Sequence, residues 1–181
     1  MIEGEAIRLR RAELADLEFL TALVNDAEVE PYLAAGGTRD AQTLRAEIER
    51  SLDSPEDVGR FVVEERKGQD WKKAGTLRFE LVNRRSRIAE LGGLAVDPGA
   101  RGRGIGDEAA RLLQRHLLLD VGVHRLQLEI YGFNERAIRH AERVGFVREG
   151  VRRKAYWRRG EWVDGVLFGL LRDDLDVSGS E

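Results

Sequence analysis

Three glycines and two arginines alternate in a stretch of the sequence that could bind phosphate. The stretch runs from Arg101 to Gly106 and separates an aliphatic run that ends at Val96 from a long amphipathic segment. Alternate glycines let backbone N–H groups point into one concavity, and a helix that starts there adds unpaired N–H groups and partial positive charge. The arginines add further positive charge. The spacing therefore predicts an anion site at a strand-to-helix junction.

Two common nucleotide motifs do not fit this loop. A dinucleotide-binding loop needs G-x-G-x-x-G near the first strand, whereas Gly102, Gly104 and Gly106 give G-x-G-x-G deep in the chain. A P-loop needs Gly-Lys-Ser or Gly-Lys-Thr, but Asp107 follows Gly106 here. A tight surface turn is the alternative interpretation, although three alternating glycines and two arginines exceed what a turn requires.

The elements that must position this loop follow from the spacing of apolar residues. Helical spacing predicts helices over 12–25, 40–52, 104–121 and 134–144. Alternating or β-branched residues predict strands over 6–10, 61–63, 76–81, 87–96, 126–130, 146–156 and 162–171. Asp40 or Thr38 is the expected N-cap of the second helix, and Gly122 is the expected end of the third. The order predicts an α/β (α+β) fold with a mostly antiparallel sheet and one parallel pair across a strand–helix–strand crossover.

Composition narrows the class of protein further. The 30 Lys and Arg residues and 33 Asp and Glu residues give a net charge of −3, which argues against nucleic-acid binding by bulk charge. The absence of cysteine and the presence of only three histidines argue against a metal site, and we expect no metal. No signal peptide or membrane-spanning run is visible, so we expect a cytoplasmic protein with no membrane partner. We expect one domain over residues 1–172, followed by a polar tail over 173–181.

Motifs along the second half of the chain point to one family. The stretch from Arg101 to Gly106 looks like the R/Q-x-x-G-x-G/A loop of the GNAT N-acetyltransferases, and Pro98 precedes it as usual. Three later segments resemble the branch that contains RimJ and RimL: Asn134 to Ile138, Val144 to Phe146, and Glu149 to Arg152. The resemblance covers nearly the whole chain. It implies the GNAT fold, a twisted, mixed and mostly antiparallel sheet of about seven strands flanked by about four helices and split near the fourth strand.

The resemblance also implies acetyl-CoA as the donor and a primary amine as the acceptor. It assigns the pyrophosphate to the backbone N–H groups of the loop, and it lays the pantetheine arm along Leu94 and Val96 in the split of the sheet. The N–H near Leu94 would polarise the thioester carbonyl as an oxyanion hole does, so Leu94 counts as catalytic through its backbone. The expected cofactor-binding residues are Leu94, Val96, Arg101, Gly102, Arg103, Gly104, Ile105, Gly106, Asp107 and Asn134.

Acetylation of an amine at neutral pH calls for a general base, because an ammonium must lose a proton before it can attack. Glu90 is the first candidate, since strand alternation predicts that it shares a face with Gly92, Leu94 and Val96. By resemblance it also lies on the strand that carries the base in histone-acetylating members of the superfamily. A solvated carboxylate at a strand end is the competing interpretation of Glu90. Glu129, on the neighbouring strand, is the second candidate.

The family's usual general acids are missing. Many members carry a tyrosine seven residues after the motif asparagine, and some carry a serine three residues after it; these positions hold Ala141 and Ala137 here. Tyr131 could substitute, or no acid is needed because a thiol is already a tolerable leaving group. Asn134 itself either binds the pantetheine or simply caps a helix.

Several functions stay open on the sequence alone. The acceptor amine could be a protein N-terminal α-amine, a polyamine, an aminoglycoside or another small amine. A non-enzymatic CoA-binding module is a second class, favoured by the missing tyrosine and serine. An RNA-binding domain that uses the basic run 148–159 is a third, although a solvated hairpin face explains the same run. A homodimer also stays open.

Overall fold

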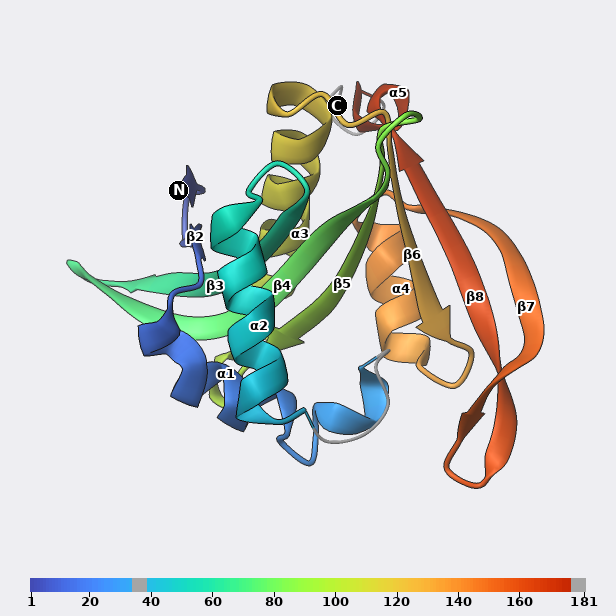
Figure 1. Ribbon diagram of the computed structural model, residues 1–181, viewed down its shortest axis with the longest axis horizontal. Coiled ribbons are helices and arrows are strands. Elements are labelled where there is room, and N and C mark those ends of the chain that lie inside the picture. The colour runs from blue at the N-terminus through green and yellow to red at the C-terminus, as the bar shows by residue number, and fades with distance from the viewer. Residues whose placement is uncertain (34–38, 177–181) are drawn as a thin grey trace.

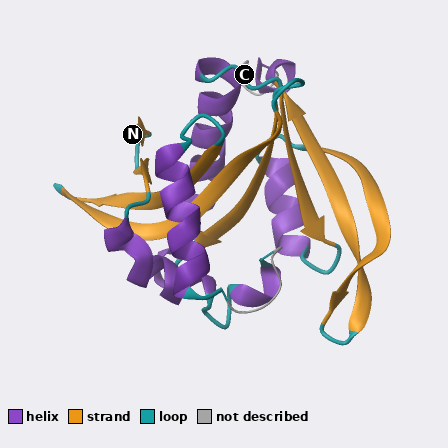
Figure 2. Cartoon of the chain, in the orientation of Figure 1, coloured by secondary structure: helices purple, strands orange, loops and turns teal. Residues whose placement is uncertain are grey.

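The computed structural model describes residues 1–33 and 39–176 and arranges them around one eight-stranded sheet (Figures 1 and 2). The strands lie in the order β1-β2-β3-β4-β5-β6-β8-β7, and every neighbouring pair is antiparallel except β5 and β6. The strands are β1 Ile2–Glu3, β2 Ile7–Arg11, β3 Val58–Lys67, β4 Asp70–Asn83, β5 Ile88–Val96, β6 Arg125–Tyr131, β7 Val147–Arg158 and β8 Glu161–Leu171.

The structure contains all four helices that the apolar spacing predicts, although the first begins at Leu17 rather than at residue 12 and follows a 3₁₀ turn. The helices are α1 Leu17–Val24, α2 Ala41–Asp53, α3 Ile105–Arg115, α4 Glu135–Arg143 and α5 Arg172–Asp176, with short 3₁₀ turns η1 Leu14–Asp16, η2 Glu30–Tyr32 and η3 Pro98–Ala100. A π-helical turn, His116–Asp120, continues α3, and Gly122 with a φ of +74° follows its end. Asp40 caps α2 by accepting a hydrogen bond from the N–H of Thr43, whereas Thr38 lies outside the described residues. Within the described ranges, no helix has the length and apolar character needed to cross a membrane.

The helices cover the two faces of the sheet separately. Leu20 of α1 and Leu44 of α2 pack with Val62 of β3 in one core cluster. Ile105 of α3 and Ala141 of α4 belong to a larger cluster on the opposite face. In Figure 1, α1 and α2 lie in front of the sheet and α3 lies behind it. The two layers are referred to below as the α1/α2 face and the α3/α4 face.

The sheet splits between β5 and β6, as the family resemblance implied. The two strands pair in parallel only where residues 88–90 lie beside residues 125–127. Beyond Glu90, β5 stays paired with β4 as far as Val96, while β6 follows β8 as far as Tyr131. The splitting strand is the fourth strand of the prediction but the fifth of the structure. The added strand is the two-residue β1, which is too short to show alternation.

The predicted polar tail begins as a helix. Residues 172–176 form α5, in which Asp174 accepts a hydrogen bond from the N–H of Leu171 at 2.7 Å. Leu175 packs against the larger core cluster. This helix is the fifth, where about four were expected, and residues 177–181 lie outside the described part of the chain.

A β-bulge interrupts β5 at the point where the sheet splits. Thr76 of β4 pairs with Ala95, and Arg78 pairs with Gly92, so two steps along β4 correspond to three along β5. The extra residue falls at Gly93, whose φ is +60°. Glycine adopts this left-handed conformation without the strain that a side chain would impose, which explains why the bulge forms here.

The bulge reverses the faces that the following residues occupy. Before it, Glu90 and Gly92 lie on the α1/α2 face. After it, Ala95 lies on that same face and packs with Leu23 of α1. Leu94 and Val96 therefore lie on the α3/α4 face, where they pack against the larger core cluster. The prediction that Glu90 shares a face with Leu94 and Val96 is wrong, because alternation does not carry through a bulge.

Candidate functional site

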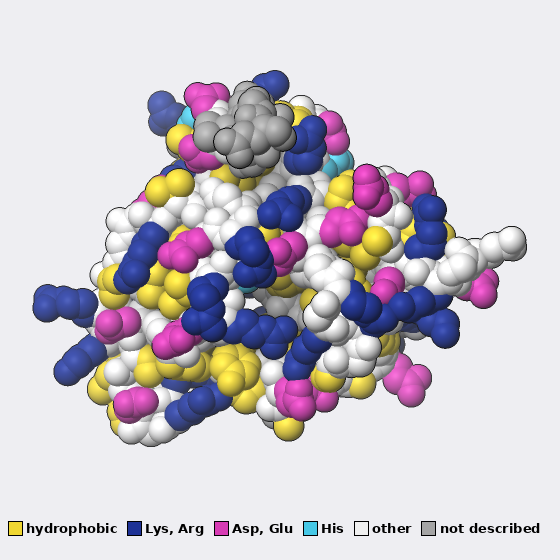
Figure 3. Space-filling view, turned by 180° about the vertical axis from the view of Figure 1, so that it is seen from behind, with side chains coloured by type: hydrophobic (Ala, Val, Ile, Leu, Met, Phe, Trp, Pro, Cys, Tyr) yellow, Lys and Arg dark blue, Asp and Glu magenta, His cyan; other side chains and the backbone are white. Residues whose placement is uncertain are grey.

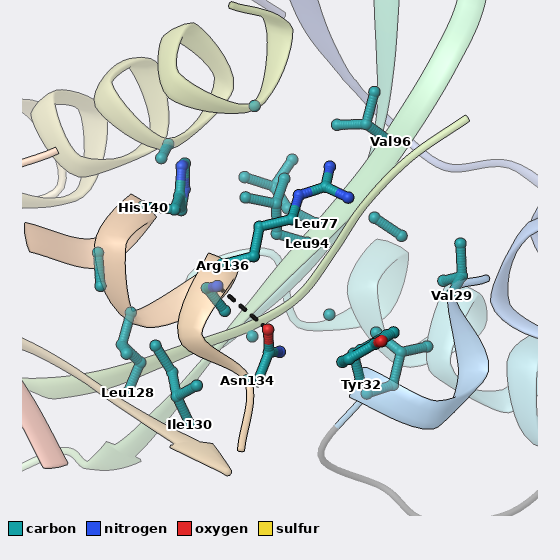
Figure 4. Close-up of a pocket in the computed structure, with 18 of the residues that line it drawn as sticks. Val29, Tyr32, Leu77, Leu94, Val96, Leu128, Ile130, Asn134, Arg136 and His140 are labelled. Carbon is teal, nitrogen blue, oxygen red and sulfur yellow. Dashed lines mark hydrogen bonds between the residues drawn. The ribbon is translucent and has the colours of Figure 1, made fainter. Parts of the chain in front are cut away.

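A cleft of about 1310 Å³ enters the sheet where β5 and β6 diverge. Its walls are residues 90–96 of β5 and 128–131 of β6, and it reaches the loop before α3 and runs along α4. Figure 4 places Leu128 and Ile130 of β6 across from Leu94 and Val96 of β5. Because Glu90 also lines it, the cleft is lined by residues from both faces of the sheet.

The loop before α3 has the conformation expected of an anion site. Gly102 and Gly104 have φ values of +78° and +74°, and a Cβ added at either would meet no atom within 4 Å. Gly104 is the N-cap of α3, and no side chain of the described residues caps this helix end. Gly104, Gly106 and Asp107 line the cleft. The first-turn N–H groups of α3 are thus available for an anion in open space, and the loop fits a pyrophosphate.

An apolar path leads from this loop to the split in the sheet. A Cβ added at Gly106 would lie 3.6 Å from Val96 Cγ2 and 3.9 Å from Leu94 Cδ2. Both side chains line the cleft together with Leu128 and Ile130. Past Glu90, the β6 side of β5 has no strand partner among the described residues. A narrow, extended arm with amide groups could therefore pair with this free edge.

An ion-pair network lies beside the loop and was missed from the sequence. Asp107 Oδ1 lies 2.9 Å from His140 Nδ1, and Arg143 donates two hydrogen bonds to the same carboxylate at 2.5 and 2.8 Å. The bonds from Arg143 and His140 lower the pKa of Asp107 to about 2. Burial lowers the pKa of His140. Arg143 therefore compensates a carboxylate that would otherwise repel an anion in the loop.

This network gives a testable expectation for anion binding. Arg143→Gln should raise the Kd for acetyl-CoA roughly two- to fivefold, more at low salt, because Asp107 is left less compensated. Arg115→Gln removes the same charge from an exposed position at the other end of α3 and serves as the control. Isothermal titration of both variants checks the expectation. Equal Kd values for the two would contradict it.

The two loop arginines differ in where they point. Arg101 lines the cleft and pairs with Glu28 from the α1–η2 connection. Arg103 does not line it: its guanidinium donates to the carbonyl oxygen of Gly99 at 2.8 Å and pairs with Glu65 of β3 at 3.2 Å. Of the expected cofactor-binding residues, Arg103 alone lies outside the cleft lining. Its contact with the cofactor stays a prediction that this geometry does not favour.

Unlike Arg103, several basic residues of α4 line the cleft: Arg136, Arg139 and Arg143. The rear view of the molecule shows Lys and Arg side chains gathered across the middle of that face (Figure 3). Figure 4 shows Arg136 extending over the cleft near Leu94. The sequence places these residues on the predicted helix after Asn134. It does not show that their side chains point toward the cleft, because that depends on how the helix packs in the fold.

Asn134 caps α4. Its Oδ1 accepts a hydrogen bond from the N–H of Ala137 at 3.1 Å, drawn as the dashed line in Figure 4. The residue is 8% exposed and lines the cleft. Its amide NH₂ has no hydrogen-bond partner among the described residues, so the capping role is confirmed and a contact with the pantetheine stays a prediction.

The two candidate bases lie on the α1/α2 face in different surroundings. Glu90 lines the cleft and makes no hydrogen bond or ion pair with any described residue. Glu129 also lines it, but its Oε2 lies 3.2 Å from Arg152 Nη1. A carboxylate without a partner can accept a proton without first losing an ion pair, so the geometry favours Glu90.

Aromatic residues from distant parts of the chain close the same side of the cleft. The rings of Tyr131 and Tyr156 are 5.3 Å apart, and those of Tyr131 and Phe133 are 5.5 Å apart. Tyr32 of η2 contacts Phe133 from across the cleft, with ring centroids 6.2 Å apart. Burial raises the pKa values of Tyr131 and Tyr156. Tyr32, Phe133 and Tyr156 had no sequence signal, because three separate segments contribute them.

The basic run 148–159 lies on β7, the edge strand of the sheet, and on its turn into β8. Arg152 pairs with Glu129, and Arg158 donates to the carbonyl oxygen of Pro31 at 3.3 Å. Arg152, Tyr156 and Arg159 of this run line the cleft.

Known proteins resemble the chain over nearly its full length. The family model described as "Acetyltransferase (GNAT) domain" matches residues 6–147. The SPbeta prophage-derived uncharacterized N-acetyltransferase YokL of Bacillus subtilis (strain 168) is 26% identical, covering 97% of this chain and 95% of that protein. The spermidine N(1)-acetyltransferase of Escherichia coli (strain K12) is 27% identical, covering 95% of this chain and 89% of that protein.

Solved structures share the fold. The spermidine N-acetyltransferase from Vibrio cholerae, crystallised with CoA and spermine, superposes with a TM-score of 0.83 at 21% identity, covering 94% of this chain and 98% of that one. A crystal structure described as a putative acetyltransferase superposes with a TM-score of 0.76 at 28% identity, covering 97% of this chain and 88% of that one.

Proposed function

The chain belongs to the GNAT acetyltransferase family, and from that premise we propose that it transfers the acetyl group of acetyl-CoA to the primary amine of a small molecule. The observation that carries the proposal is the two-sided cleft at the split of the sheet. Its α3/α4 side holds an anion loop and an apolar path. Its α1/α2 side holds Glu90, a carboxylate with no ion-pair or hydrogen-bond partner among the described residues.

The donor side has the groups that acetyl-CoA needs. The N–H groups from Gly102 to Asp107 would hold the pyrophosphate, and the basic residues of α4 would add positive charge. The free edge of β5 at Leu94 and Val96 would pair with the pantetheine arm. When bound, the cofactor supplies an acetyl thioester, and the N–H at Leu94 would donate a hydrogen bond to its carbonyl oxygen.

The acceptor side of the cleft holds the candidate general base. Glu90 would take one proton from the incoming ammonium, which leaves the nitrogen lone pair free to form the new C–N bond as the C–S bond breaks. The second proton of the attacking nitrogen would pass to solvent as the amide forms, and the thiolate that departs as the C–S bond breaks would be protonated from solvent. No side-chain acid is required, which is consistent with alanine at positions 137 and 141.

The shape of the acceptor side supports a small amine. The β7–β8 hairpin reaches over to η2, where Arg158 donates a hydrogen bond to the carbonyl oxygen of Pro31, and this bridge would restrict the access of a large acceptor to the cleft. Two relatives of this chain are named as spermidine acetyltransferases. The resemblance to the RimJ and RimL branch keeps a protein N-terminal α-amine as the alternative acceptor.

An acceptor screen tests the proposal. Release of free CoA from acetyl-CoA would be measured with polyamines, aminoglycosides, amino-acid amides and short peptides. We expect turnover with at least one small amine and none with peptides. Turnover only with peptides would contradict the small-amine proposal, and tight CoA binding without turnover on any amine would favour a non-enzymatic CoA-binding module.

The cofactor should also stabilise the protein. At about a hundred times its Kd, acetyl-CoA should add ~2.7 kcal/mol to the free energy of unfolding. For a chain of this length that corresponds to a rise in Tm of roughly 5–10 °C. Thermal unfolding with and without acetyl-CoA measures the shift. No change at millimolar acetyl-CoA would contradict the donor assignment, and a shift with ATP or NAD instead would point to a nucleotide site.

A further inference from the structure

A cation lies against two aromatic rings at the mouth of the acceptor side. The guanidinium carbon of Arg159 is 4.9 Å from the ring centroid of Phe133 and 5.4 Å from that of Tyr32. The two rings are tilted by 50° to each other, and all three residues line the cleft. Aromatic faces attract a cation within about 6 Å because their quadrupole places negative charge above the ring. The ring pair therefore already acts as a cation site.

Three elements that are far apart in sequence build this site. Tyr32 belongs to η2, Phe133 follows β6, and Arg159 lies in the turn between β7 and β8 with a φ of +51°. The neighbouring Arg158 fixes the turn to η2 through Pro31 and lies 5.2 Å from the ring of Tyr131. The hairpin tip thus brings the Arg159 guanidinium across the cleft to the ring pair.

The Arg159 guanidinium lies against the two rings and has no charged or hydrogen-bonding partner in the described part of the chain. The residue is exposed. A side chain of this kind can move into solvent without leaving a buried charge unpaired. A second cation that reaches the rings from inside the cleft could therefore take its place.

The ring pair faces the side on which the acceptor must bind. Gln127 lies beside Glu90 in the parallel register, and Tyr131 is four residues further along β6, so alternation puts Tyr131 on the α1/α2 face with Glu90. Phe133 stacks on Tyr131 with an angle of 18° between the rings. A molecule whose amine is at Glu90 can extend within the same cleft toward Phe133 and Tyr32.

We propose that Tyr32 and Phe133 form a subsite for a second cationic group of the acceptor, an ammonium or guanidinium at its far end. Arg159 occupies this subsite until such an acceptor binds. The proposal rests on the proposed function, since it assumes that an amine is acetylated at Glu90. It selects acceptors by the charge of the end that does not react.

Acceptors that differ only in that end test the subsite. Butylamine, 1,4-diaminobutane and 4-aminobutanoate have the same chain length with a neutral, a cationic and an anionic far end, and their six-carbon counterparts extend the series. We expect kcat/KM for the diamine to exceed that for the monoamine by roughly five- to thirtyfold, with the amino acid lowest. Phe133→Leu should bring the diamine-to-monoamine ratio close to one. Arg159→Gln should raise it, because the competing cation is removed.

A matched variant separates the subsite from a general effect on the hairpin. Trp162→Leu removes an exposed aromatic ring that contacts Trp157 in the same hairpin but does not line the cleft, and it should keep the wild-type ratio. A preference for 4-aminobutanoate would overturn the proposal, because Arg159 would then be recognising an anion. A ratio that Phe133→Leu leaves unchanged would overturn it as well.

A binding experiment tests the subsite even if the proposed acetyltransferase activity is not found. If no amine is acetylated, 1,4-diaminobutane would be titrated into the CoA-saturated protein by calorimetry. Binding that weakens at least severalfold in Phe133→Leu would support the cation subsite. Absence of binding, or equal binding by the variant, would overturn it.

Discussion

Replacing Glu90 by Gln should lower kcat by ~10²–10⁴-fold near neutral pH, the usual contribution of a general base. The substitution keeps the size of the side chain but removes its ability to take a proton. The KM for acetyl-CoA should barely change, because the lost interaction matters only as the amine is deprotonated. Raising the pH should partly restore the rate, since more of the amine is then neutral without help. Steady-state kinetics between neutral and alkaline pH measure both effects.

Glu129→Gln is the matched control, because Glu129 lines the same cleft on the same face but is paired with Arg152. Glu129→Gln should lower kcat far less than Glu90→Gln does. A loss below about fivefold at every pH for Glu90→Gln would remove Glu90 from the mechanism, and position and carbonyl polarisation would then suffice. A large loss of kcat in Glu129→Gln, with kcat unchanged in Glu90→Gln, would assign the general base to Glu129 on β6 instead.

Gly104→Glu should abolish the stabilisation by acetyl-CoA. The new side chain would enter the open space above the loop, and its carboxylate would repel the pyrophosphate. The left-handed φ of +74° adds a strain cost of ~1–2 kcal/mol to the fold itself. Thermal unfolding of the variant with and without acetyl-CoA measures binding and fold stability together.

Gly68→Glu supplies the matched control for that strain. Gly68 has a φ of +66° and open space around its Cβ position, but it lies in the β3–β4 turn and does not line the cleft. It should lose similar intrinsic stability and keep the full shift with acetyl-CoA. If Gly104→Glu still binds acetyl-CoA within a few-fold of the wild type, the pyrophosphate is held elsewhere.

The parts of the site that depend on local sequence could be predicted. The glycine loop, the helix that follows it and the cap at Asn134 each depend on residues within a few positions, so composition and spacing were sufficient. The split beside the strand ending at Val96 came from the family resemblance, and the register of β5 and β6 confirms it. In these cases local chemistry and the tertiary fold agree.

The face of Glu90 could not be predicted, because one extra residue at Gly93 reverses the alternation of β5. A Gly92-Gly93 pair signals a distortion but does not say where the register shifts. The reversal has a chemical consequence. It puts the candidate base on one face of the sheet and the cofactor path of Leu94 and Val96 on the other.

Contacts between segments that are distant in the chain could not be predicted from the sequence either. The pairing of Asp107 with His140 and Arg143 depends on how α3 and α4 pack. The contact of Tyr32 with Phe133 depends on how η2 meets the loop after β6. No spacing rule links such positions, because their separation is set by the whole fold.

The claim that two substrates meet in one cleft for direct transfer can be tested by isotope exchange. An enzyme preparation that acetylates an amine would be incubated with acetyl-CoA and labelled CoA in the absence of any amine. Direct attack of the amine predicts no exchange of label into acetyl-CoA, because the acetyl group never resides on the protein. Exchange at a rate comparable to turnover would show an acetylated protein side chain and contradict direct transfer through the cleft.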